Sequence, residues 1–154
     1  MSAITNATRT INWKPATMVT LALAVIAVLA NPSGPLGSFW RPANSAVAPG
    51  TLLPLFVLLK IAEGLSFGVG ISFLIFGYSM VKAISPASAG LTRAAHLSIA
   101  WLLFSWWPHD SLHIHNGMNN MAGLLAIEYA FHITAMIAAV ILARFFLTLL
   151  RRPA

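Results

Sequence analysis

The sequence predicts an all-α integral membrane protein, built as an antiparallel four-transmembrane-helix bundle. Hydrophobic residues make up 58% of the 154 residues and charged residues only 8%. A soluble domain is nearer ~45–50% apolar and ~25% charged. The mean hydropathy is +0.82. A surface of this composition is incompatible with water, so the composition excludes a soluble enzyme, and it excludes an intrinsically disordered chain as well.

Apolar stretches separated by polar segments define the expected architecture. We expect one membrane domain over 1–154, with spans over about 13–31, 51–82, 92–107 and 121–150. The outer loops are then 32–50 and 108–120. The apolar run in the first span also resembles the core of a signal peptide. We expect a membrane helix there instead.

The second stretch is too long for one simple crossing. As a single helix, 51–82 would measure ~48 Å at ~1.5 Å per residue, against a hydrocarbon core of ~30 Å. We therefore expect this helix to be kinked or overlong, with the part around Pro54 lying beyond the core or along its surface.

The basic residues predict the orientation. Four spans place both termini on one side, and seven basic residues fall on that side: Arg9, Lys14, Lys82, Arg93, Arg144, Arg151 and Arg152. The opposite side has Arg41 in the first loop and no Lys or Arg in 108–120. Because basic loops favour the cytoplasm, we predict both termini to be cytoplasmic, in a bacterial-type inner membrane.

Ionisable side chains gather at the outer end of this arrangement. The chain has three acidic residues and five histidines, and such groups in a membrane are costly enough to be site candidates. Only His96 belongs to the inner end. The others fall in the outer third of the bilayer or just above it: Glu63, His109, Asp110, His113, His115, Glu128 and His132.

Spacing predicts which of these side chains can meet. Glu128 and His132 are four residues apart and share a helix face, which we expect to point into the bundle. An extended backbone would direct His113 and His115 to the same side. If the segment instead opens with a helical turn, His109 and His113 share a face.

These residue types predict a transition-metal site of copper, zinc or iron. Imidazole and carboxylate ligands suit these metals, and the absence of cysteine excludes thiolate sites. Heme is disfavoured, since His96 and His132 lie at opposite ends of the bilayer. The predicted ligands are Glu128 and His132 within the membrane, His109, His113 and His115 above it, and Asp110 and Glu63 as further members.

Each of these residues also has a plainer interpretation. The histidines of 108–120 would be hydrated interfacial residues, and Glu128 and His132 would only bond each other. Glu63 would pair with Lys60 at i, i+3. The functional alternatives are therefore metal-dependent catalysis or metal handling, a non-catalytic scaffold or assembly subunit, and a proton or ion relay. Whether the chain is an enzyme, and which residues would be catalytic, stays open.

The small size and composition of the chain predict which partners it has. It is small, has little extramembrane mass, and carries small-residue faces such as Gly64 and Gly68, so we expect a homo-oligomer or a subunit of a larger membrane complex. Nucleic acid is excluded because the basic residues do not cluster. Nucleotide is excluded because no glycine-rich phosphate loop follows a strand.

The predicted orientation can be tested by labelling, because the natural chain has no cysteine. We expect His115→Cys to react with a membrane-impermeant maleimide added outside intact cells, since positive-inside topology places 108–120 there. The control Ala89→Cys, in the short loop between the second and third spans, should react only after the membrane is opened. Labelling of residue 115 only from the cytoplasmic side would overturn the orientation.

Overall fold

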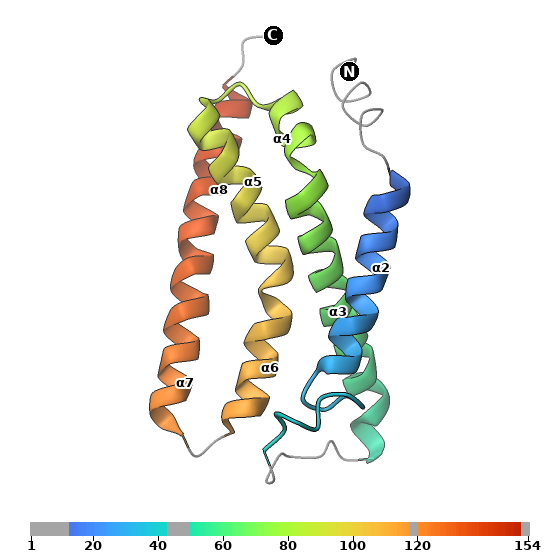
Figure 1. Cartoon of the computed structure of the whole chain (residues 1–154). Coiled ribbons are helices and arrows are strands. Elements are labelled where there is room, and N and C mark those ends of the chain that lie inside the picture. Colours follow the sequence, from blue (N-terminus) through green and yellow to red (C-terminus); the bar gives the residue numbers. More distant parts are fainter. Residues whose placement is uncertain (1–12, 43–49, 118–119, 152–154) are drawn as a thin grey trace.

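The protein is described by a computed structural model covering residues 13–42, 50–117 and 120–151, and these residues are helical apart from short connections (Figure 1). No strand occurs in these three ranges, which confirms the all-α class. The elements in chain order are α2 (Trp13–Ala30), the 3₁₀ turn η1 (Gly50–Leu52), α3 (Leu53–Phe76), α4 (Tyr78–Ile84), α5 (Ala89–Phe104), α6 (Trp106–Asn116), α7 (Met121–Glu128), the π-helical turn η2 (Tyr129–Ile133) and α8 (Thr134–Leu150).

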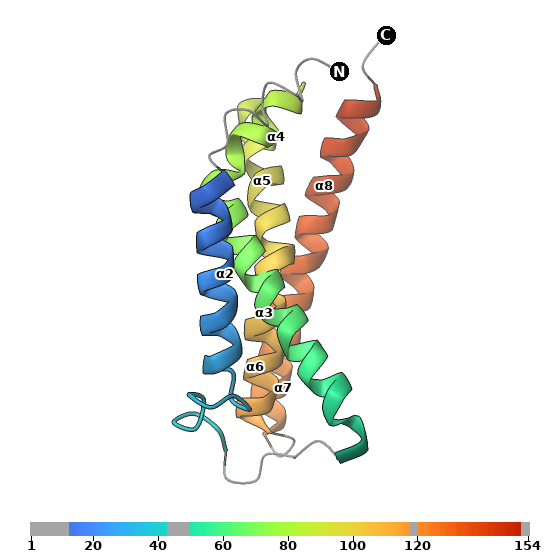
Figure 2. The same ribbon diagram turned by 90° about the vertical axis from the view of Figure 1, so that its right-hand side faces the viewer.

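Consecutive helices join into long columns that run antiparallel (Figures 1 and 2). α3 continues into α4, α5 into α6, and α7 through η2 into α8. Three helical stretches of the described chain are long and apolar enough to cross a membrane: Trp13–Ala30, Gly50–Phe76 and Met121–Leu150. Ala89–Phe104 is apolar but shorter. The fold therefore indicates membrane association, whereas a four-span bundle with cytoplasmic termini stays a prediction.

The second stretch is broken, as its length predicted. α3 ends at Phe76 and α4 begins at Tyr78, with Gly77 between them. α3 itself begins close to Pro54, which stands in its first turn. Proline is tolerated there because its missing N–H would have no partner within the helix.

The segment 108–120 differs from the outer loop that we predicted. It is helical as far as Asn116, within α6. Pro108 does not end the chain's helical course, because it stands in the first turn of α6, where proline fits. Gly117, with φ of 66°, ends the helix in a conformation that favours glycine. Residues 118–119, and 43–49 of the first predicted loop, lie outside the described residues.

Close packing holds neighbouring columns together. α2 packs on α3, α3 on α5 and α5 on α8. A Cβ at Gly64 would come 2.6 Å from Val28 Cγ2, so the predicted small-residue face of α3 is the surface against α2. Between α4, α5 and α8, the buried side chains of Val81, Ala95 and Phe145 form a small core.

The α7–α8 column lies at one edge of the molecule (Figure 1). It packs on α5 and α6, and among the described elements it makes no extensive contact with α2. Much of its apolar surface is therefore exposed, including Met136 and Val140. This exposure is what a lipid-facing helix requires.

Candidate metal centre

Helix α6 holds two histidines one turn apart on the side that faces α7. His109 Nε2 and His113 Nε2 lie 3.0 Å apart, and the ring planes are nearly perpendicular. This pairing follows from the helical course of 106–116, because residues four apart share a face. The helical alternative from the sequence is therefore the one that is confirmed.

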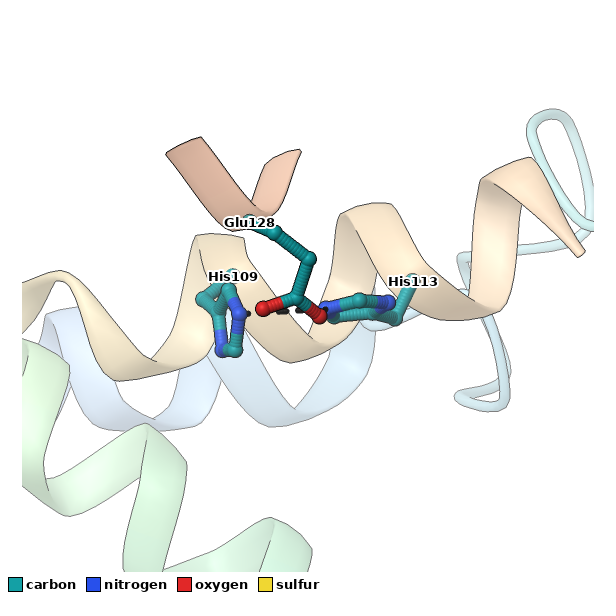
Figure 3. A group of neighbouring side chains, drawn as sticks. All are labelled: His109, His113 and Glu128. Carbon is teal, nitrogen blue, oxygen red and sulfur yellow. Dashed lines mark hydrogen bonds and ion pairs between the residues drawn. The ribbon is translucent and has the colours of Figure 1, made fainter. Parts of the chain in front are cut away.

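Glu128, the last residue of α7, reaches toward this pair. Figure 3 shows its carboxylate lying between the rings of His109 and His113. Glu128 Oε1 is 3.2 Å from His113 Nε2. One ligand atom from each of the three residues lies within 4.8 Å of the others. Donors around one ion at ~2.1 Å stand up to ~4.2 Å apart, so small side-chain adjustments would let the three share a metal.

His132 joins the cluster from the π-helical turn. Its Nδ1 lies 2.6 Å from Glu128 Oε2, and its ring centroid is 5.3 Å from that of His109. The turn η2 begins directly after Glu128 and contains His132. A π-helical turn inserts one extra residue into a helix, and such turns are frequent at functional sites.

The direction of the Glu128–His132 pair differs from our expectation. We predicted that it points into the bundle along a face through Ala135 and Ala139. Instead the His132 side chain is 61% exposed and that of Glu128 is 43% exposed, and Ala139 is exposed as well. The physical reason is the edge position of the α7–α8 column, which has a neighbour on only one side.

The environment of His109 favours the form that binds metal. Burial lowers the pKa of His109 below its usual value, and the neighbouring His113 and His132 lower it further. The carboxylates of Glu128 and Asp110 act in the opposite direction. The lowered pKa favours the neutral imidazole, which is the form of histidine that binds metal ions.

Glu63 and Asp110 do not join this cluster. Both pair with Lys60: the Lys60 ammonium contacts the Asp110 carboxylate, and its Nζ lies 3.1 Å from Glu63 Oε2. Glu63 is 1% exposed and Lys60 is also buried. The plainer interpretation of Glu63, an i, i+3 ion pair, is thus the geometry observed.

His115 also stands apart from the cluster. Its Nδ1 lies 2.5 Å from the carbonyl oxygen of Trp40, and the two rings are 5.8 Å apart. We predicted that an extended backbone would bring His115 to the side of His113. The helix overturns this, because residues two apart point in very different directions on a helix.

Two polar contacts near this end had no clear signal in the sequence. Asn31 and Ser111 are both buried, and Asn31 Nδ2 donates to Ser111 Oγ at 3.2 Å. Trp107 Nε1 donates to the carbonyl oxygen of Ala27 at 2.8 Å. Both fix α6 against the C-terminal end of α2. Nothing in the spacing pairs residues so far apart in the chain.

No family model matches this chain, and no characterised protein or solved structure is similar to it. Its function is therefore inferred from the geometry of the site and the composition of the helices.

The buried ion cluster predicts a large effect of Lys60→Met. Removing one partner of a buried pair typically costs ~3–5 kcal/mol, because the remaining charge is left unpaired. Here Glu63 and Asp110 would both lose their cationic partner. We expect a strongly lowered free energy of unfolding in detergent, with partial recovery in Lys60→Arg. The control Lys82→Met changes an exposed lysine and should have little effect. Equal stability of both methionine variants would contradict a structural role for the cluster.

Proposed function

We propose that this chain is a membrane protein with a transition-metal site at the outer leaflet, used for metal-dependent catalysis or for metal handling. The observation that carries the proposal is the convergence of His109, His113 and Glu128, whose ligand atoms lie within 4.8 Å of one another. These ligands come from two separate helices, α6 and α7. Two histidines one turn apart on a single helix could be neighbours by chance, but the addition of a carboxylate from a second helix favours a site.

The energetic cost of these groups supports a bound ion. Glu128 and His132 stand within the apolar stretch Met121–Leu150, where polar groups without partners are expensive. Their mutual contact engages His132 Nδ1 and Glu128 Oε2. The other carboxylate oxygen, Oε1, has His113 of α6 as its neighbouring partner in the described structure. A divalent cation satisfies several such ligands at once.

The donor set narrows the chemistry. Two imidazoles and one carboxylate with open positions are typical of non-heme iron(II) sites, and two histidines with a glutamate also form catalytic zinc sites. His132 supplies either a fourth ligand or a group that orients Glu128. The set favours iron or zinc over copper(I), which prefers sulfur ligands.

A proton relay is less well supported than a metal site. That alternative needs Glu63, Glu128 and His132 as successive stations. Glu63 pairs with Lys60 on the α3 side of α6, whereas Glu128 pairs with His113 and His132 on the α7 side.

Metal analysis of the purified protein tests the proposal. A preparation made without a histidine tag should contain about one iron or zinc ion per chain, as expected for a site with preformed ligands. His113→Ala and Glu128→Ala should lose the metal, because each removes one of the three converging ligands. His115→Ala is the matched control, since its imidazole lies against Trp40.

The proposed site fails if the natural chain, purified gently and then given Fe²⁺ or Zn²⁺, retains neither. Equal metal loss in His115→Ala and His113→Ala would also contradict it.

We propose further that the chain works in a homo-oligomer or as a subunit of a larger membrane complex. The edge position of the α7–α8 column supports this, because it leaves the partly exposed Glu128 and His132 beside the bilayer. Covering them with protein would lower the cost of their exposure to lipid.

The mass of the mildly solubilised protein checks this association. We expect a particle of at least two chains, or one chain with other subunits, because the exposed polar pair favours a protein neighbour over lipid. A monodisperse single chain of 16.5 kDa after correction for detergent would contradict the proposal.

A further inference from the structure

A shallow groove runs along the outside of the molecule between α5 and α8. Its volume is about 270 Å³, and its lining is almost entirely apolar. Small residues form its floor, among them Ala94 and Ser98 from α5 and Ala138 from α8. Ser98 and Ala138 are buried, so the helices approach closely beneath the groove.

The groove ends beside the proposed metal centre. Trp101 and Thr134 line its outer end, and Thr134 directly follows the π-helical turn that contains His132. Trp101 stacks on Phe131 with ring centroids 5.7 Å apart. Phe131 in turn lies 5.1 Å from the ring of His109. The rings of Trp101 and Phe131 thus connect the groove to His109, one of the proposed metal ligands.

Trp101 has a further property that indicates a missing partner. Its indole Nε1 is buried and has no hydrogen-bond partner. Among the described residues, no other buried side-chain nitrogen or oxygen lacks a partner. An unpaired buried donor is costly, and each such group in a native protein calls for an explanation. A polar oxygen bound beside Trp101, which lines the groove, would supply the missing acceptor.

The exposure of the metal ligands agrees with entry from the bilayer. Glu128 and His132 are 43% and 61% exposed, although they stand within an apolar stretch long enough to cross a membrane. A molecule dissolved in the lipid can therefore reach them without passing through the protein. A molecule restricted to water would have to reach the same groups at the membrane boundary.

From these observations we infer that the groove binds the hydrocarbon chain of a membrane-dissolved, single-chain amphiphile, with its polar end at the His109–His113–Glu128 centre. The proposal rests on the proposed function and names its substrate class. Along α5 the groove extends from Ala94 to Trp101, which is ~10 Å along the helix axis at ~1.5 Å per residue. It thus has room for part of an alkyl chain. The apolar lining recognises the chain, and the metal and Trp101 recognise the polar end.

Photo-crosslinking in phosphatidylcholine vesicles tests this inference. The probe is a saturated fatty acid with a diazirine at mid-chain, added in trace amount to the natural protein. We expect cross-links concentrated on groove residues of α5 and α8, and competition by unlabelled fatty acid. Thr134→Phe fills the outer end of the groove and should reduce this labelling about tenfold, because an added aromatic side chain occupies the binding volume.

The matched control is Met136→Phe, on the same helix but outside the groove lining, where the side chain is exposed. Its labelling should equal that of the natural protein. Cross-links spread evenly around α8, or equal labelling in Thr134→Phe and Met136→Phe, would overturn the inference. Cross-links from the groove to a second copy of the chain would overturn it too, in favour of self-association.

Metal content measured on the same samples separates the two proposals. Bound metal with evenly spread cross-links leaves the metal site standing and overturns the groove. Localised cross-links in a protein that retains no metal support a chain-binding groove and overturn the metal function. Localised cross-links that persist in metal-depleted Glu128→Ala, but move away from Trp101, support the assignment of the polar end to the metal centre.

Discussion

The ion cluster of Lys60, Glu63 and Asp110 is the constraint on which the arrangement around α6 depends. Lys60 and Glu63 are buried on α3, and the only low-energy arrangement for such charges is mutual pairing. The contact of Lys60 with Asp110 fixes α6 against α3. Because a helix has a fixed rotation per residue, fixing Asp110 also fixes where its neighbours point. His109 and His113 are thereby directed to the side of α7.

Helix α6 therefore contacts three neighbouring helices, each with a different side. One side meets α3 through Asp110, a second meets the C-terminal end of α2 through Ser111 and Trp107, and the third carries the two histidines. On the first two sides, Asp110 pairs with Lys60, and Ser111 and Trp107 hydrogen-bond to Asn31 and to the carbonyl oxygen of Ala27. The third side meets the carboxylate of Glu128, which is more exposed than that of Asp110. Within the described residues, the histidines of this third side and Glu128 form the candidate metal centre.

The sequence predicts the helical class, because composition and hydropathy depend little on tertiary contacts. It also predicts the Glu128–His132 contact, which is local to one helix. It fails where the answer depends on distant partners. From the sequence, Pro108 is compatible both with the end of one helix and with the first turn of the next. In the structure it stands in the first turn of α6. Which of Lys60 and a metal would neutralise Asp110 depended on how α3 and α6 pack.

The direction in which the cluster opens bears on what a metal there would do. A structural metal has its shell filled by protein ligands and is closed to solvent, whereas a catalytic metal keeps a position free. His109 and His113 are partly buried on α6, whereas Glu128 is partly exposed and His132 is largely exposed at the edge of the molecule. The π-helical turn that carries His132 is itself a local departure from α-helix, and such turns are frequent at functional sites. A site used only to hold α6 against α7 would need neither the exposure nor the irregular turn. Both features favour a centre that receives something from outside the chain.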